Sequence, residues 1–312
     1  MESHKGHAHS SGGARKITRP LMMALVITLV FALVELLGGL FSGSLALISD
    51  SGHMFTDVIA LALSLWAGFI ATRMGNENQT FGLLRVEILV ALINGVILGA
   101  ISFFIMYEAV VRVLTPQTID AGVMLIIAII GLAANVAGVL ILREDAKVNL
   151  NVKGAFLHVL GDMLSSIGVI VAALLIYFFG LKVADPIISF AISLVILYSA
   201  YRIVRQSVYI LLEFAPGDID INQMMSEMKK VPGVMDIHDI HVWTIGSGVY
   251  ALSAHVEVED RPVSECASIL RGLEDLLKDK YNISHTTLQL EYEKLEGYTC
   301  VFRKPLGPED GK

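Results

Sequence analysis

Six long apolar segments occupy the first two thirds of the chain, and short polar stretches separate them. Each segment is about as long as the roughly 20 residues that a helix needs to cross a bilayer, or longer, and few charged residues interrupt it. The pattern predicts an all-α bundle of six transmembrane helices, with spans over residues 20–41, 45–72, 84–111, 120–142, 153–179 and 184–205.

The pattern changes after Arg205, where polar residues become frequent. Helical and alternating spacings of apolar residues follow one another, and Gly246 to Gly248 mark a hairpin turn. The order αββαβ predicts a small two-layer α+β domain with its helices on one face of a sheet. The expected elements are a helix over 219–230, strands over 234–244 and 249–258, a helix over 262–280 and a strand over 286–292.

Composition agrees with a membrane protein that carries a polar domain. The 312 residues are 54% hydrophobic and 17% charged, whereas soluble domains carry about 25% charged residues. From Glu213 onward, 18 acidic residues stand against 10 basic ones, which argues against nucleic acid as a partner. The two cysteines, Cys266 and Cys300, form no Cys-x-x-Cys motif, so we expect a reducing compartment and no disulfide framework.

Basic residues are distributed unevenly between the two sides of the predicted bundle. If the N-terminus is cytoplasmic, only Arg112 and Lys182 lie on the outer side. The positive-inside rule then places both termini in the cytoplasm. Short loops favour a prokaryotic plasma membrane. The basic residues of the cytoplasmic side are Lys5, Arg15, Lys16, Arg19, Arg73, Arg85, Arg143, Lys147, Lys153, Arg202 and Arg205.

The predicted domains are four. Residues 1–16 form a disordered cytoplasmic arm, in which His4, His7 and His9 either capture a metal ion or belong to a solvated tail. The transmembrane domain extends over 17–212 and the cytoplasmic domain over 213–293. A flexible tail over 294–312 completes the chain.

Two of the apolar segments contain the same motif, His-x-x-x-Asp: His53 with Asp57, and His158 with Asp162. Residues four apart share one face of a helix, so each helix presents an imidazole beside a carboxylate at membrane depth. Ionisable groups are costly there and mark ion pathways. Together the pairs supply two nitrogen and two oxygen ligands, a set typical of tetrahedral zinc. The same groups bind protons, so metal binding is coupled to proton release.

Other polar residues also fall within the spans. Asp50 shares the face of His53 and is interpreted as an outer carboxylate, as part of a proton route, or as a helix N-cap. A polar bridge between helices is the alternative for a single His-x-x-x-Asp pair, and two identical pairs make it the weaker reading. We expect some of the remaining polar residues to hydrogen-bond between helices and some to line a water path; they are Glu35, Asn94, Glu108 and Asn135.

A second group of ligand-type residues lies in the polar domain. His238 and His255 face each other across the predicted hairpin. Strand alternation puts Ile240 on the face of His238 and His241 on the opposite face. Unless the strand is irregular, we therefore expect His238 and His241 not to share a metal ion. The density of such residues favours a metal site over isolated exposed histidines. The group comprises His238, His241, His255, His285 and Glu291.

Taken together, these motifs resemble the cation diffusion facilitator family, the zinc-type efflux transporters. The resemblance covers residues 17 to 293. It rests on the segments Ser44–Asp57, Phe81-Gly82 with Arg85 and Glu87, His158–Asp162, His238–Trp243 and Thr286–Glu291.

The resemblance implies a homodimer with paired ferredoxin-like cytoplasmic domains and proton-coupled export of divalent cations by alternating access. The resemblance implies that His53, Asp57, His158 and Asp162 form the transport site. It also implies a cytoplasmic zinc site at His238, His255 and Glu291, with His285 as a further candidate. Arg85 and Glu213 hold the positions of a charge interlock at the dimer. Many members have histidines and an additional metal in the loop between the second and third spans; residues 73–80 contain no His, so we expect no metal there.

The predicted function is export of zinc, or of cadmium or cobalt, across the lipid bilayer in exchange for protons. The same fold transporting another physiological divalent metal is the main alternative. A membrane metalloenzyme would keep a ligand position open for water, whereas four ligands fill this shell and no His-Glu-x-x-His motif is present. A membrane-anchored metal sensor would have no need of ionisable residues in two spans. We therefore expect a transporter and not an enzyme.

Overall fold

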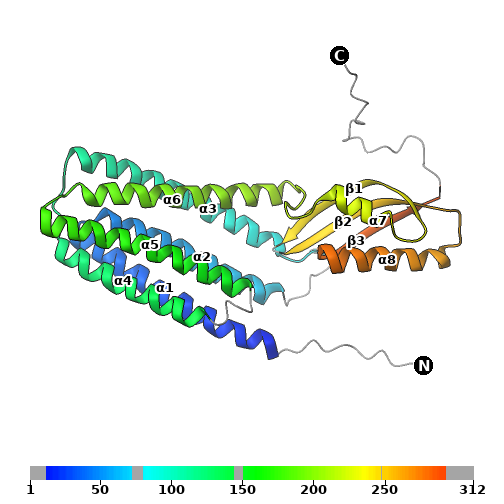
Figure 1. Cartoon of the computed structure of the whole chain (residues 1–312), viewed down its shortest axis with the longest axis horizontal. Helices are drawn as coiled ribbons and strands as arrows, with labels where there is room; N and C mark the ends of the chain where they lie inside the picture. The colour runs from blue at the N-terminus through cyan, green and yellow to red at the C-terminus, as the bar shows by residue number, and fades with distance from the viewer. Residues whose placement is uncertain (1–11, 72–79, 144–149, 247, 293–312) are drawn as a thin grey trace, which may run out of the picture. The chain divides into compact units, whose positions relative to one another are not determined.

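The structure, a computed structural model, describes residues 12–71, 80–143, 150–246 and 248–292. Each predicted span corresponds to one helix, which confirms the six-helix bundle (Figure 1). Five of the six helices contain described stretches that are long and apolar enough to cross a membrane. The remaining helix is α2, which has 27 residues. The helices are α1 (Gly12–Ser42), α2 (Leu45–Ala71), α3 (Leu84–Leu114), α4 (Ala121–Leu142), α5 (Leu150–Phe179) and α6 (Ala184–Leu211).

The start of α1 differs from the prediction. The helix begins at Gly12, so the disordered arm expected over residues 1–16 was wrong for its last five residues. Ala14, Arg15 and Lys16 are good helix formers and allow the helix to extend beyond its apolar part. Three other expectations concern residues outside those described. They are metal capture by His4, His7 and His9, the loop over residues 73–79 that should hold no metal, and the flexible tail over 294–312.

Hydrogen bonds between helices hold the bundle together at several depths. Asn94 Nδ2 on α3 donates to the backbone oxygen of Thr56 on α2 at 3.3 Å. Asn135 Nδ2 on α4 donates to Ser166 Oγ on α5 at 3.2 Å. These contacts confirm the interhelical role expected of two polar residues within the spans. Such bonds satisfy polar groups that lipid cannot.

The first turn of α2 is capped by a carboxylate from α6. Asp185, which is fully buried, accepts hydrogen bonds from the backbone nitrogens of Leu45 at 2.8 Å and Ala46 at 3.2 Å. It also accepts one from Ser44 Oγ at 2.5 Å. The first amides of a helix have no partner within the helix, so this cap defines where α2 begins. Asp50 lies in the second turn of α2, and the interpretation of Asp50 as the N-cap was therefore wrong.

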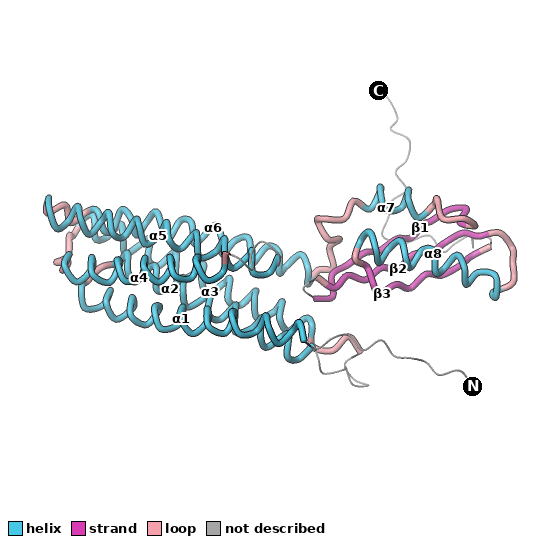
Figure 2. Tube along the Cα trace, turned by 60° about the horizontal axis from the view of Figure 1, so that its bottom comes forward, coloured by secondary structure: helices cyan, strands magenta, loops and turns pink. Residues whose placement is uncertain are grey.

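The polar domain has the predicted order αββαβ. Its sheet has the strand order β1-β2-β3, with β1 and β2 antiparallel and β2 and β3 parallel. Buried residues of both helices, such as Met228 and Leu273, form one core with inward-facing strand residues, such as Val256. Figure 2 shows the helices and strands of this domain. One face of the sheet is therefore covered, and the other carries polar side chains. The elements are α7 (Ile221–Met228), β1 (Val234–Gly246), β2 (Val249–Val258), α8 (Val263–Tyr281) and β3 (Ile283–Glu291).

The chain divides into two compact units. One contains Met1–Met74 with Leu89–Arg205, and the other contains Gly75–Ile88 with Gln206–Lys312. The first residues of α3 and the last residues of α6 thus belong to the same unit as the sheet.

Strand β1 contains an extra residue between His238 and His241. His238 pairs with His255, whereas His241 pairs with Ser253, so three steps along β1 correspond to two steps along β2. Asp239 has φ +48°, a left-handed conformation that Asp tolerates better than most residues. The strand therefore has a β-bulge at this point.

Candidate metal sites

The first candidate site lies between α2 and α5. His53 Nε2 is 3.4 Å from Asp162 Oδ1, which joins one member of each His-x-x-x-Asp motif. Asp162 is buried and His53 is partly buried. The two motifs, more than 100 residues apart in sequence, are thus neighbours in the bundle.

A second contact defines the register of the two helices. Ser165 Oγ on α5 donates to Asp50 Oδ1 on α2 at 2.5 Å. His53 lies three residues after Asp50 on α2, whereas its partner Asp162 lies three residues before Ser165 on α5. The two helices therefore run antiparallel. Four residues further, the same register places backbone positions 57 and 158 level with each other. The side chains of Asp57 and His158 lie outside the described residues.

Asp50 is buried one turn before His53 on α2. Its hydrogen bond to Ser165 links the two helices that carry the motifs. This position agrees with the interpretation of Asp50 as an outer carboxylate of the site, which orients the helices without itself belonging to the motif.

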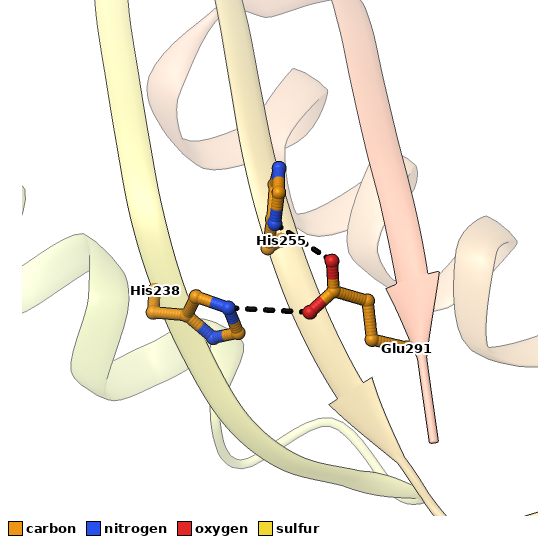
Figure 3. Close-up of side chains that lie close together, drawn as sticks. All are labelled: His238, His255 and Glu291. Atoms are coloured by element: carbon orange, nitrogen blue, oxygen red, sulfur yellow. Dashed lines mark ion pairs between the residues drawn. The ribbon is translucent and has the colours of Figure 1, made fainter. Parts of the chain in front are cut away.

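The second candidate site lies on the open face of the sheet. Glu291 Oε1 is 2.8 Å from His255 Nδ1, and Glu291 Oε2 is 3.3 Å from His238 Nε2. Figure 3 shows the two imidazoles on neighbouring strands, each joined by a dashed line to the Glu291 carboxylate on the third strand. One ligand atom from each residue lies within 4.8 Å of the other two, so these residues can provide three ligands of a tetrahedral metal site.

The bulge in β1 changes which residues share this face. Ile240 is buried in the core with Ile237, and His241 shares the open face with His238. The expectation that Ile240 shares the face of His238 was wrong, because the extra residue shifts the alternation by one position. His241 Nε2 lies 3.1 Å from Asp239 Oδ1.

His285 lies apart from this cluster. It occupies the start of β3 and pairs with Ala251, whereas Glu291 lies at the end of the strand. The ring of Phe81, just before α3, contacts the His285 ring edge to face, with 5.3 Å between the centroids. Among the described residues, the structure brings together His238, His255 and Glu291 and leaves His285 out.

Arg85 and Glu213 form an ion pair within one chain. Arg85 Nη2 lies 2.6 Å from Glu213 Oε1, so the pair joins the start of α3 to the residues that follow α6. Both side chains are about half exposed. An exposed pair of this kind contributes roughly 0–1 kcal/mol to stability.

Two residues of the bundle were not singled out from the sequence. Asp185 caps α2 from a distance of 140 residues in the chain, and no local pattern reveals such a partner. Glu35 was noted only as one of several polar residues within the spans. The structure shows that it is almost completely buried.

Comparison with known proteins agrees with this architecture. Residues 21–212 match the family model described as the cation efflux transmembrane domain, and residues 216–293 match that of the cation efflux protein, cytoplasmic domain. The chain belongs to the cation efflux family. This is the cation diffusion facilitator family that its motifs resemble.

Similar relatives cover nearly the whole chain. A cadmium, cobalt and zinc/H(+)-K(+) antiporter of Bacillus subtilis is 42% identical over 303 residues, which are 96% of each protein. Zinc transporter ZitB of Escherichia coli is 40% identical over 298 residues, which are 94% of each. Metal cation efflux system protein CzcD of Cupriavidus metallidurans is 38% identical over 291 residues, which are 93% of this chain and 91% of the relative. This cation efflux protein is therefore a multi-pass integral membrane transporter and not an enzyme.

Proposed function

We propose that this cation efflux transporter exports zinc from the cytoplasm in exchange for protons. The observation that carries the proposal is the contact between His53 and Asp162, which brings the two His-x-x-x-Asp motifs together. Imidazole nitrogens and carboxylate oxygens suit zinc better than magnesium or manganese. Relatives named for cadmium, cobalt and zinc support this class of substrate, with cadmium and cobalt as alternative cargo.

The transport site consists of His53, Asp57, His158 and Asp162. Zinc entering from the cytoplasm displaces protons from these side chains, since a ligand must be deprotonated to bind metal. The bundle then opens outward, and protons that enter from outside discharge the metal. Because the same atoms bind either zinc or protons, the two fluxes are coupled. Asp50 orients the site from one turn away.

The cytoplasmic domain binds a further zinc ion at His238, His255 and Glu291. The metal's positive charge reduces repulsion between two acidic domains and favours a compact homodimer. The family model that matches this domain is named for dimerisation, which supports the homodimer. Arg85 and Glu213, which pair with each other within the single chain, also hold the positions of the charge interlock at this dimer. His285 is not part of this site.

The topology follows from the distribution of basic residues. Both termini lie in the cytoplasm, and the protein resides in a prokaryotic plasma membrane. The transmembrane domain extends over 17–212 and the metal-binding and dimerisation domain over 213–293.

The decisive experiment measures zinc flux into proteoliposomes under an imposed pH gradient. Wild type is compared with Asp57→Ala and Asp162→Ala. We expect gradient-dependent flux in wild type and loss of flux in both folded variants. Flux that persists in both variants would show that the pathway lies elsewhere. If folded wild type transports cadmium or cobalt but not zinc, the proposed cargo is wrong and the proposed site stands.

A further inference from the structure

Glu35 on α1 is a buried carboxyl group that the transport site does not use. Only 2% of the residue is exposed, and its Oε2 atom has no hydrogen-bond partner among the described residues. Its Oε1 atom lies 2.5 Å from the place that a Cβ atom would occupy at Gly131 of α4. The side chain thus lies against a glycine of another helix, inside the bundle and away from lipid. A carboxyl group in such a place is costly to keep ionised.

Carboxyl groups of two other helices increase that cost: Asp50 on α2 and Asp162 on α5. His53 lies one turn further along α2 and is neutral or positive, so it does not add to the cost. Between its first and last residues, α4 contains no ionisable residue. The charges of Asp50 and Asp162 both act on Glu35, and both are negative when ionised. Three carboxylates cannot all remain ionised in a low-dielectric interior without a compensating cation.

We propose that Glu35 is a proton-binding site coupled to metal occupancy of the transport site. This inference rests on the proposed function, because the compensating cation is the zinc ion bound at His53 and Asp162. Without metal, the Glu35 carboxyl group carries a proton. When zinc binds, the O–H bond breaks, the proton leaves to water, and the dication balances the new carboxylate. The reverse transfer restores the proton when the metal leaves.

This role is separate from that of the ligands. A ligand exchanges its proton because the metal occupies the same atom, whereas Glu35 exchanges its proton because the local charge changes. Glu35 therefore adds to the number of protons exchanged for each metal ion. Removing it reduces that number while the metal still binds.

The test measures protons released per zinc ion bound by the full-length protein in detergent micelles, with a pH indicator in weak buffer. Glu35→Gln removes the proton-binding group and keeps its shape. Glu108→Gln is the matched control, because Glu108 is another glutamate of the bundle and pairs with Arg112 along its own helix. We expect Glu35→Gln to release about one proton fewer than wild type and Glu108→Gln to match wild type. The cytoplasmic site contributes equally to all three proteins.

Several results would overturn the inference. If Glu35→Gln binds zinc and releases as many protons as wild type, Glu35 is not a coupled site and the proposed function stands. If the folded variant no longer binds zinc in the bundle, Glu35 is a ligand. Asp162→Asn tests the proposed function separately: unchanged zinc binding in the bundle would overturn both proposals.

Two further measurements keep the proposal testable if Glu35→Gln does not fold. Glu35→Leu supplies an apolar side chain that suits the bundle interior, and the expected loss of about one proton is the same. Infrared difference spectra on zinc addition compare wild type with Glu35→Leu. Wild type should lose more protonated-carboxyl signal than the variant, and equal losses would overturn the inference.

Discussion

Glu227 on α7 is hydrogen-bonded to Tyr281 at the end of α8. Its Oε2 atom accepts from the tyrosine hydroxyl at 2.9 Å, and its Oε1 atom accepts from Lys280 Nζ at 2.5 Å. The hydrogen bonds from Lys280 and Tyr281 hold the pKa of Glu227 below its ordinary value. Loss of water contact, and then the bond to Glu227, raise the pKa of Tyr281 to about 12. The two helices that cover the sheet are thus connected by titratable groups.

This connection predicts a pH dependence of the cytoplasmic domain. Because the pKa of Tyr281 is raised, its contribution to stability is complete below about pH 10, its ordinary value, and is lost as pH rises through about 12. Glu227 acts in the opposite sense, since its contribution is lost as pH falls below the ordinary value for Glu. Thermal unfolding followed by Trp243 fluorescence should show a smaller alkaline loss in Tyr281→Phe than in wild type. Tyr292→Phe, at an exposed position, is the control, and equal profiles for all three would contradict the prediction.

The bulge at Asp239 predicts an unusual ranking of substitutions. At φ +48°, a β-branched residue is strained, so Asp239→Val should lower the free energy of unfolding of the domain by about 1–3 kcal/mol. Asp239→Asn keeps a residue type that tolerates this conformation and should change stability by less than about 1 kcal/mol. Urea unfolding of the two variants measures the difference. If Val is tolerated as well as Asn, position 239 does not need a left-handed conformation.

The cytoplasmic metal cluster predicts a clear contrast between two histidines. His255→Ala removes one of the three proposed ligands and should weaken zinc binding in this domain by at least about 100-fold. His285→Ala should leave it unchanged, because His285 contacts Phe81 at the other end of β3. Calorimetric titration of both variants in an Asp162→Ala background isolates the cytoplasmic site. Equal weakening in both would place His285 among the ligands.

The cap that α6 provides to α2 predicts an effect on transport at a distance from the site. Asp185→Ala leaves two backbone donors of α2 unsatisfied and should reduce stability by about 0.5–2 kcal/mol. Zinc flux should fall too, because α2 carries His53. Asp120→Ala is the matched control, since Asp120 caps α4 through the amides of Gly122 and Val123. Equal loss of flux in both variants would show a general effect of helix caps and no specific role for α2.

Much of the fold was predictable because its signals are local. A helix that crosses a bilayer needs a long apolar stretch, so hydropathy alone located all six spans. The periods of apolar residues gave the order αββαβ, since each element buries one face. The motif His-x-x-x-Asp, which occurs twice, identified His53 and Asp162 as candidate ligands, because in each copy the His and the Asp share one face of a helix.

One error had a signal in the sequence. The buried residues that β1 contributes to the core of the domain are Ile237, Ile240 and Val242, spaced by three and then by two. A regular strand repeats every two residues, so the spacing of three marks the extra residue at Asp239. The prediction that Ile240 shares the face of His238 assumed regular alternation from His238 and did not use this spacing.

The sequence by itself determined which residues could bind metal and which segments form helices or strands. Only the tertiary structure decided which of them meet. The antiparallel register of α2 and α5, the cap from Asp185, the burial of Glu35 and the separation of His285 from Glu291 all depend on contacts between distant segments. The physical reason is that helix and strand periodicity arise from neighbouring residues, whereas burial and pairing depend on how whole elements pack.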